Sequence, residues 1–342
     1  MRGRKARIEI VDRVCGEWGH VDVDHTILSD SDRGAEAMIA GISDETREFH
    51  MTFSYSPAEG LGLEEGWTRR DPSDVAKIGP LYYVWYTKTD KGPDGYNATV
   101  WCAASPDGHR WTEKGEAIAR GGRGAWDEHS VFTPNILVAQ SRCYLFYTAV
   151  PEPFTNTGPD GGTKTAIGVA VSDSPDGPWT RFEGKPILKP SDDANDFDSH
   201  RIDDSCLIVR DGKYWLYYKG RQMRHSPAET KMGLAVAGNP TGPYVRHPEN
   251  PLIGSGHEVL VWPHREGIVA WVQGCGPEGN TIQYAPDGLH FSVKASSGPP
   301  SAAGAYRPDA FTDTKNGQGI EWGISQQGGR HPHLVRYNCA WP

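Results

Sequence analysis

The fold is decided by a short aromatic run that reads Tyr82-Tyr83-Val84-Trp85-Tyr86-Thr87, because the chain repeats it at intervals. Runs of the same apolar and aromatic character begin again at Cys143, Tyr214, Gly267 and Gly319. Continuous runs of this kind are typical of strands that are buried on both faces. Five copies of one such strand predict a repeat architecture rather than a single sheet.

A tight turn followed by an aromatic residue repeats beside these strands. Its four copies are Ser105-Pro106-Asp107-Gly108 before Trp111, Ser174-Pro175-Asp176-Gly177 before Trp179, Asn239-Pro240-Thr241-Gly242 before Tyr244, and Ala285-Pro286-Asp287-Gly288 before Phe291. Proline in second place and glycine in fourth place are typical of type I turns, which close antiparallel hairpins. The sequence therefore predicts an all-β fold, a five-bladed β-propeller. A pair of β-sandwiches, the competing architecture, would not need the same turn four times.

The chain divides into a short N-terminal extension and the propeller. Residues 1–66 show little periodicity, and the stretch 31–49 is partly helical in pattern. Met51-Thr52-Phe53-Ser54-Tyr55 alternates in the manner of a strand. We expect a partly helical extension over 1–66 and the five-bladed propeller over 67–342.

Composition excludes several classes of partner. The formal net charge is −9 and no long basic run is present, which argues against nucleic acids and anionic membranes as partners. No apolar segment follows the basic N-terminus and none is long enough to span a bilayer, so we expect a cytoplasmic protein.

Twelve Trp and fourteen Tyr suggest that the protein stacks aromatic rings on sugars. His331 and His333 alternate on one strand without a third ligand nearby, and we predict neither a metal site nor a cofactor.

Polar residues stand at the start of every repeated unit. The five starts read Arg70-Asp71-Pro72-Ser73, Phe132-Thr133-Pro134-Asn135, Ile202-Asp203-Asp204-Ser205, Gly256-His257-Glu258-Val259 and Arg307-Pro308-Asp309-Ala310. Innermost strands of a propeller converge on one end of the tunnel, so these residues would surround a single funnel. An Asp-Pro pair taken alone more often caps a surface turn, here with Arg70 as its ion-pair partner; repetition of the pattern favours a site.

Glycoside hydrolysis would use such a funnel. It needs one carboxylate to activate water and one acid to protonate the leaving oxygen, and a third acidic group often tunes the acid. The candidates are Asp71, Asp203, the His257–Glu258 pair and Asp309. Neighbours on a strand point to opposite sides, so only one of His257 and Glu258 is expected to face the cavity.

Several motifs together resemble glycoside hydrolase family 117, the 3,6-anhydro-L-galactosidases that act on neoagaro-oligosaccharides. The motifs lie within about residues 45 to 335 and are Gly62 to Ser73, Tyr82 to Lys88, Trp126 to Pro134, Asp203 to Leu207, Tyr217 to Arg221, and Gly256 to Val259. Each motif alone is weak, but their order and number make the set specific. The resemblance implies a five-bladed propeller, and an oligosaccharide as its substrate.

The resemblance also implies an inverting mechanism with Asp71 as general base and His257 as general acid. His257 would replace the glutamic acid of related furanosidase propellers, and an aspartate of the third blade would modulate it. Aligning Asp71-Pro72-Ser73 with Asp203-Asp204-Ser205 favours Asp203 for that third role, with Asp204 as the alternative. Histidine suits the acid because its pKa lies near neutrality and a carboxylate would hold it protonated. A structural histidine, with Glu258 as the acid, is the other interpretation.

Weaker candidates for substrate contacts surround this set, each with a structural alternative of packing or surface ion pairing. They are Arg70, Trp126, His129, Thr133, Asp204, Lys219, Glu258 and Gln273. Members of the resembled family form homodimers through an N-terminal helical segment, which residues 1–40 do not match clearly, so a homodimer is left open.

The function predicted is exo-acting release of a terminal α-1,3-linked 3,6-anhydro-L-galactose. A propeller furanosidase acting on galactofuranose or arabinofuranose is the first alternative, since fold and chemistry can persist while a pocket changes. A carbohydrate-binding propeller without catalysis is the second, although it would not need Asp71, Asp203 and His257 together. A phosphorylase would need a cluster of cations around a phosphate, for which Arg69, Arg70 and Arg221 are the candidates.

Overall fold

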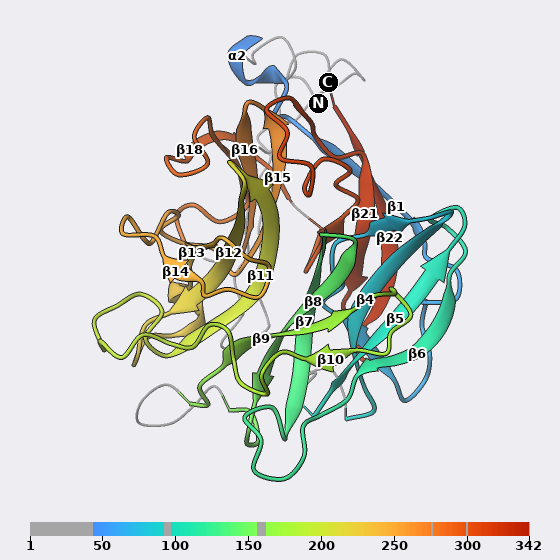
Figure 1. Ribbon diagram of the computed structural model, residues 1–342. Coiled ribbons are helices and arrows are strands. Elements are labelled where there is room, and N and C mark those ends of the chain that lie inside the picture. Colours follow the sequence, from blue (N-terminus) through green and yellow to red (C-terminus); the bar gives the residue numbers. More distant parts are fainter. Residues whose placement is uncertain (1–43, 92–96, 156–161, 275, 299, 342) are drawn as a thin grey trace, which may run out of the picture. The chain divides into compact units, whose positions relative to one another are not determined.

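The protein is described by a computed structural model that covers residues 44–91, 97–155, 162–274, 276–298 and 300–341. Within these ranges the helical elements are short, namely α2 (Asp44–Arg47) and the 3-10 turn η1 (Pro227–Glu229). All other regular elements are strands, and they form five antiparallel sheets arranged as the blades of a propeller (Figure 1). The predicted five-bladed β-propeller is confirmed. Most of the predicted helical stretch 31–49 lies outside the described residues.

Blade 1 has an innermost strand that is interrupted. Its sheet runs in the order β2-β4-β5-β6, and β3 pairs with β4 beyond the end of β2. The two short strands are therefore halves of one inner strand, separated by residues 71–75. The strands are β2 (Thr68–Arg70), β3 (Ala76–Ile78), β4 (Leu81–Thr89), β5 (Thr99–Ser105) and β6 (Thr112–Ile118).

Blades 2, 3 and 4 repeat the same plan, with the innermost strand first in sequence order. Blade 2 contains β7 (Ser130–Ala139), β8 (Arg142–Val150), β9 (Ala166–Ser172) and β10 (Thr180–Arg181). Blade 3 contains β11 (Arg201–Arg210), β12 (Lys213–Arg221), β13 (Lys231–Ala237) and β14 (Val245–Arg246). Blade 4 contains β15 (Glu258–Arg265), β16 (Gly267–Gln273), β17 (Thr281–Ala285) and β18 (Ser292–Ser296), and β20 (Gly317–Gln318) pairs beside β15.

Blade 5 joins the two ends of the propeller. Its order is β1-β22-β21-β19, with β1 (Thr52–Pro57), β22 (His333–Ala340), β21 (Trp322–Gln327) and β19 (Gly304–Ala305). In Figure 1 the blue strand β1 lies beside the red strand β22. Pairing of β1 with β22 closes the ring between the first and last blades. Part of the stretch 1–66, which the sequence analysis assigned to an extension, is thus a strand of the propeller.

The repeated aromatic runs form the second strand of each blade, as β4, β8, β12 and β16. Most of their side chains are buried, because each blade packs against a neighbour on both faces. In blade 5 the expected strand 319–324 begins three residues later, at Trp322.

The four predicted turns each connect the third and fourth strands of a blade. Their final glycines have positive φ, namely Gly108 (73°), Gly177 (86°), Gly242 (95°) and Gly288 (78°). In the last three turns the glycine N–H donates to the carbonyl three residues earlier, at 3.0 to 3.1 Å. Glycine recurs at this place because an L side chain would be strained there.

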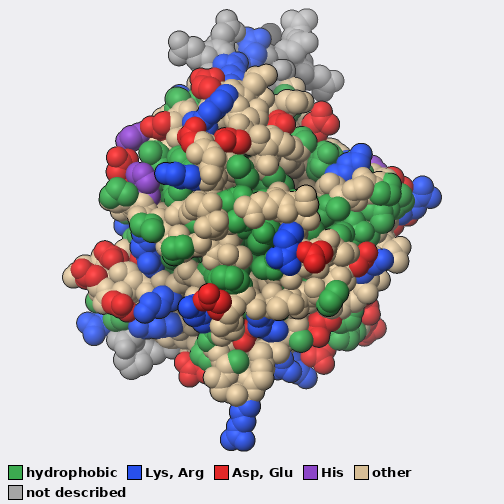
Figure 2. Space-filling view, viewed as in Figure 1, with side chains coloured by type: hydrophobic (Ala, Val, Ile, Leu, Met, Phe, Trp, Pro, Cys, Tyr) green, Lys and Arg blue, Asp and Glu red, His purple; other side chains and the backbone are tan. Residues whose placement is uncertain are grey.

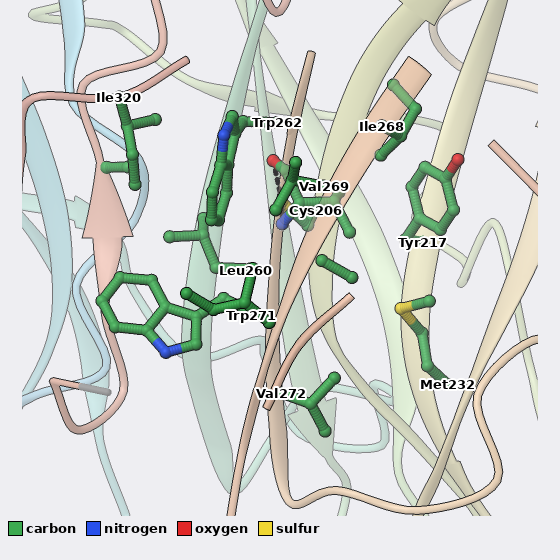
Figure 3. Close-up of a cluster of buried hydrophobic side chains, with 14 of the residues drawn as sticks. Cys206, Tyr217, Met232, Leu260, Trp262, Ile268, Val269, Trp271, Val272 and Ile320 are labelled. Atoms are coloured by element: carbon green, nitrogen blue, oxygen red, sulfur yellow. Dashed lines mark hydrogen bonds between the residues drawn. The ribbon is translucent and has the colours of Figure 1, made fainter. Parts of the chain in front are cut away.

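The hydrophobic core lies between the blades. One cluster joins Tyr217 and Met232 of blade 3, Trp262 and Trp271 of blade 4, and Ile320, which follows β20. Figure 3 shows Ile320 and Tyr217 on opposite sides of this cluster, with Trp271 between them. Trp262 packs edge-to-face on Trp271, with 6.2 Å between the ring centroids, and this geometry stabilises the cluster beyond what the buried area alone provides.

A buried arginine joins four blades where their inner strands meet. Arg307 donates to the carbonyl oxygens of Val261 at 2.7 Å and Leu207 at 3.0 Å, and its guanidinium is paired with Asp74. Asp74 also accepts from the Ala305 N–H at 3.0 Å. We call Asp74 and Arg307 the hub pair, because it joins blades 1, 3, 4 and 5.

Blade 2 reaches the hub pair through an asparagine. The Asp74 N–H donates to Asn135 Oδ1 at 3.2 Å, and Asn135 Nδ2 donates to the Ser205 carbonyl at 2.6 Å. All five blades therefore contribute to one buried polar network at the centre of the ring. A network satisfied in this way fixes how the inner strands are spaced, and thus the base of any funnel above it.

Candidate active site

The innermost strands of blades 1, 2 and 3 share a bulge at the same place. In each blade two residues oppose one residue of the second strand, and the first of the two has a left-handed backbone. These first residues are Asp71 (φ 48°), Thr133 (φ 41°) and Asp204 (φ 51°). The bulge interrupts the hydrogen-bond ladder between the strands, so Pro72 and Pro134, which lack a backbone N–H, occupy the bulge without the loss of a ladder hydrogen bond.

The bulges correct the alignment of the third blade. Asp203 pairs with Lys219 just before its bulge, as Arg70 pairs with Thr87 just before the bulge of blade 1. Asp204, and not Asp203, is therefore the structural equivalent of Asp71. The alignment that favoured Asp203 is wrong by one residue, because a bulge shifts which side chain faces the cavity.

One cavity, open to solvent on one side, lies over these bulges, and its empty volume is about 570 Å³ when the open space is counted. Its polar lining includes five of the predicted residues, namely Asp71, Thr133, Asp204, Glu258 and Gln273. The remaining lining comes from Pro72, Pro134, Asn135, Ser205, Cys206, Val259, Leu260, Trp271, Pro300, Ala302 and Ala303. The structure thus brings together five of the predicted site residues from four blades.

Asp71 is held by a cation and by a neighbouring blade. Arg70 Nε lies 3.0 Å from Asp71 Oδ1 and 2.9 Å from Oδ2. The Asp71 N–H donates to Gln326 Oε1 of β21 at 3.1 Å. The residue is only 7 % exposed, so these contacts orient the carboxylate with little competition from water.

Lys219 binds the two carboxylates of blade 3. Its ammonium is paired with Asp204 and lies 3.3 Å from Asp203 Oδ1. Burial raises the pKa of Asp203 to about 6; the Lys219 charge opposes this shift and the Asp204 charge adds to it. Lys219 was predicted to reach sugar hydroxyls; in the structure its ammonium is paired with these two carboxylates.

Glu258, and not His257, is among the described residues that line the cavity. One oxygen of Glu258, Oε2, accepts from the Ala302 N–H at 2.5 Å. Burial, assisted by the Asp204 and Asp71 charges and opposed by Lys219, raises the pKa of Glu258 to about 7. This carboxyl can therefore hold a proton near neutral pH and release it to a leaving group.

His257 has the opposite electrostatic environment. Burial, followed by the charges of Lys219, Arg70 and Arg221, lowers the pKa of His257 well below its ordinary value. Its backbone N–H donates to the Gln273 carbonyl at 2.6 Å, so the residue begins the pairing of β15 with β16. At neutral pH an imidazole in its neutral form cannot act as an effective general acid, because the proton donor of histidine is the imidazolium.

Three other predicted residues lie outside the cavity lining as the structure describes it. Trp126 stacks on Tyr147 with ring centroids 5.6 Å apart, and so packs within blade 2. His129 donates its backbone N–H to the Val150 carbonyl at 3.1 Å, at the start of β7. Asp309 accepts from the Gln318 N–H at 2.7 Å and likewise does not line the cavity.

Sequence reasoning missed several contributors to the site. Asn135 and Cys206 follow two of the bulges, while Trp271 and the segment 300–303 form further parts of the cavity lining. Asn135 occurs in the quoted motif of blade 2, so its place after Thr133-Pro134 was a usable signal. Nothing in the sequence marks the segment 300–303, because it has neither periodicity nor a chemical motif.

Within the described residues, no group of three or more His, Cys, Asp or Glu is arranged to hold a metal ion.

Acidic and basic side chains are interspersed over the face of the molecule shown in Figure 2. No helix in the described part of the protein is long and apolar enough to cross a membrane.

The protein is similar to known glycosidases in sequence and in fold. The family model for glycosyl hydrolases family 43 matches residues 67–232. Zg3597, a family 117 glycoside hydrolase produced by the marine bacterium Zobellia galactanivorans, is 34% identical, with 86% of this chain and 91% of that chain covered and a TM-score of 0.78. A comparison with curated proteins gave no match.

More distant structures share the fold alone. Sucrose-6-phosphate hydrolase from Lactobacillus gasseri is 14% identical, with 90% of this chain and 64% of that chain covered and a TM-score of 0.61. The GH43_1 enzyme from Xanthomonas citri complexed with xylose is 15% identical, with coverages of 86% and 90% and a TM-score of 0.54.

Proposed function

Because this protein belongs to glycoside hydrolase family 117, we propose that it is an exo-acting inverting glycosidase that releases terminal 3,6-anhydro-L-galactose from neoagaro-oligosaccharides by cleaving an α-1,3 linkage. That it is a glycoside hydrolase follows from the family. The sugar, the linkage and the roles of individual residues are the proposal. The observation that carries it is the cavity in which Asp71, Asp204 and Glu258 come together from three blades.

The proposed base is Asp71. Its carboxylate is buried, oriented by Arg70, and lies at the cavity wall, where it can take a proton from a water molecule. An inverting mechanism needs this water on the face of the sugar opposite the acid.

The proposed acid is Glu258, in preference to its neighbour His257. A carboxyl with a pKa of about 7 is protonated in a large fraction of molecules at neutral pH, and Glu258 Oε1 is left to carry the proton because Oε2 accepts from Ala302. Asp204 is the proposed modulator, since its charge raises the pKa of Glu258. His257, which the family resemblance favours, is the alternative acid, and Asp203 the alternative modulator.

The cavity supports removal of a single terminal sugar. Its inner end is lined by Asn135, which belongs to the polar network of the hub pair, and by Cys206, whose Sγ lies 3.8 Å from Asp74 Oδ2. A pocket closed in this way accepts the end of an oligosaccharide and excludes a continuing polysaccharide. The substrate in the proposal is accordingly a short oligosaccharide.

The test is a product assay with neoagarobiose beside aryl galactofuranoside and aryl arabinofuranoside. Three variants are compared with wild type, namely Asp71→Asn, Glu258→Gln and His257→Gln, and Asp192→Asn is the matched control because its side chain is 94% exposed. Loss of a base or an acid should lower turnover by about 10²-fold or more. Anhydrogalactose release that survives His257→Gln but not Glu258→Gln supports Glu258, and the reverse pattern reassigns the acid to His257.

Other outcomes change the substrate or the mechanism. Turnover of a furanoside alone would keep the chemistry and replace the sugar. Asp71→Asn with turnover close to wild type would remove Asp71 as the base. Time-resolved NMR of the released sugar reports whether the first product has inverted configuration.

A further inference from the structure

The bulge that carries Asp71 is supported from another blade. Asp71 has a left-handed backbone, and its N–H donates to the side-chain oxygen of Gln326 at 3.1 Å. Gln326 belongs to β21 of blade 5, and its separation from Asp71 in the sequence is 255 residues. On either side of the bulge, the Arg69 N–H donates to the Pro332 carbonyl at 2.8 Å and the Ser73 N–H donates to the Trp85 carbonyl at 2.7 Å. Gln326 therefore acts on the bulge residue itself, while other bonds hold the strand.

The same glutamine holds a segment of the cavity wall. The Gln326 N–H donates to the Ser301 carbonyl at 3.0 Å, and Gln326 Nε2 lies 3.4 Å from Ser301 Oγ. Ser301 belongs to the segment 300–303, of which residues 300, 302 and 303 line the cavity. Two contacts thus join the support of the base to the wall beside it.

The segment continues to the opposite side of the cavity. The Ala302 N–H donates to Glu258 Oε2 at 2.5 Å and to Gln273 Oε1 at 3.2 Å. Glu258 and Gln273 are directly paired across β15 and β16. Ala302 has a φ of 42°, a conformation that costs free energy for a residue other than glycine and so indicates that its contacts hold it there.

We propose that Gln326, Ser301 and Ala302 form a bracket that sets the distance between Asp71 and Glu258, with Gln326 as the positioning residue of the base. The bracket rests on the proposed function, because that function makes these two carboxyls the base and the acid. The series of contacts is Asp71 N–H to Gln326, Gln326 to Ser301, and Ala302 N–H to Glu258. Its physical basis is that catalysis by two carboxyls depends on their separation, and a displacement of about 1 Å costs up to about 10²-fold in rate.

Two substitutions separate positioning from folding. Gln326→Leu has a similar size but no acceptor for the Asp71 N–H, whereas Gln326→Glu keeps an acceptor. Gln327→Leu is the matched control, since Gln327 is the next residue of β21 and is exposed. Thermal unfolding of each variant shows whether the fold is kept.

We expect Gln326→Leu to lower kcat by about tenfold to 10²-fold with KM within about threefold of wild type, because substrate binding is retained while the reacting groups are displaced. Gln326→Glu should recover much of kcat. It should also move the acidic limb of the pH–rate profile to higher pH, because a second carboxylate next to Asp71 favours protonation. A Gln326→Leu variant with kcat within about twofold of wild type and an unchanged pH profile overturns the bracket.

A second measurement does not depend on the substrate. Crystal structures of wild type and Gln326→Leu should show the Asp71 backbone out of its left-handed conformation, or the segment 300–303 displaced, in the variant. If wild type cleaves none of the tested glycosides, the proposed function fails and these structures alone decide the bracket. Identical positions of Asp71 and Ala302 in both structures would overturn it.

Discussion

The hub pair gives a prediction whose magnitude follows from the structure. In Arg307→Met, the buried guanidinium is replaced by an apolar side chain of similar length. The Val261 and Leu207 carbonyls each lose a donor, and Asp74 keeps a buried charge without its partner. Breaking one side of a buried ion pair costs about 3–5 kcal/mol, mostly because the remaining charge is uncompensated.

The expected loss is large enough to measure by thermal unfolding. At about 2–4 °C per kcal/mol for a large domain, the Tm of Arg307→Met should fall by roughly 6–20 °C. Arg123→Met, at an exposed arginine, is the control and should leave the Tm nearly unchanged. A Tm within about 2 °C of wild type would contradict the interpretation that the hub pair holds the inner strands together.

The double variant tests the reason for the loss. Asp74→Asn keeps a side-chain oxygen for the Ala305 N–H but removes the charge. Added to Arg307→Met, it should recover part of the stability, with a coupling energy of about 1–3 kcal/mol in a double-mutant cycle. Strictly additive losses would show that the two side chains act independently and that the unpaired charge is not the cause.

Three further predictions concern the cavity. Thr133→Gly should change the Tm little, because relief of a strained β-branched residue at a φ of 41° opposes the loss of the hydrogen bond from Thr133 Oγ1 to Thr148 Oγ1, and it should raise KM, because Thr133 lines the cavity; unfolding and steady-state kinetics measure both effects, and an unchanged KM would contradict the second. The raised pKa of Glu258 means that the folded state binds more protons than the unfolded state between the ordinary carboxyl range and about pH 7, so its contribution to stability falls as pH rises through that window. Glu258→Gln should then gain stability relative to wild type between about pH 4.5 and about pH 8, which unfolding at both pH values checks; an equal difference at both would refute it. Lys219→Met removes a charge that lowers the pKa of Glu258, so the alkaline limb of the pH–rate profile should move to higher pH, and an unmoved limb would exclude Glu258 as the acid.

The repeat explains why the architecture was predictable. Each aromatic run and each Pro-x-Gly turn is a local signal, and the four turns occupy the same place in four blades. Blade 5 was harder to predict from the sequence, because its inner strand is only Gly304–Ala305 and its outer strand β1 comes from the other end of the sequence. A two-residue strand has no period, and ring closure is a long-range contact.

The site was predictable to the level of the motif but not of the side chain. Asp71 and Thr133 line the cavity as expected, since their Pro-containing motifs mark the bulge directly. In blade 3 two aspartates are adjacent, and only the position of the bulge shows that Asp204 takes the place of Asp71. In blade 4 His257 and Glu258 are likewise adjacent, and only the structure shows that Glu258 lines the cavity while His257 does not belong to its lining.

By itself, the sequence determined the five-bladed propeller, the family resemblance and the strand starts that carry the polar groups, because periodicity and turn chemistry depend on neighbouring residues. Only the tertiary structure decided which side chain of each adjacent pair faces the cavity. Only the tertiary structure also shows that Gln326, Ala302 and Arg307, which come from blade 5 and its neighbouring segments, support the residues around the cavity. The physical reason is that a one-residue bulge reverses the direction of a side chain, and that contacts between residues 71 and 326 exist only once the ring is closed.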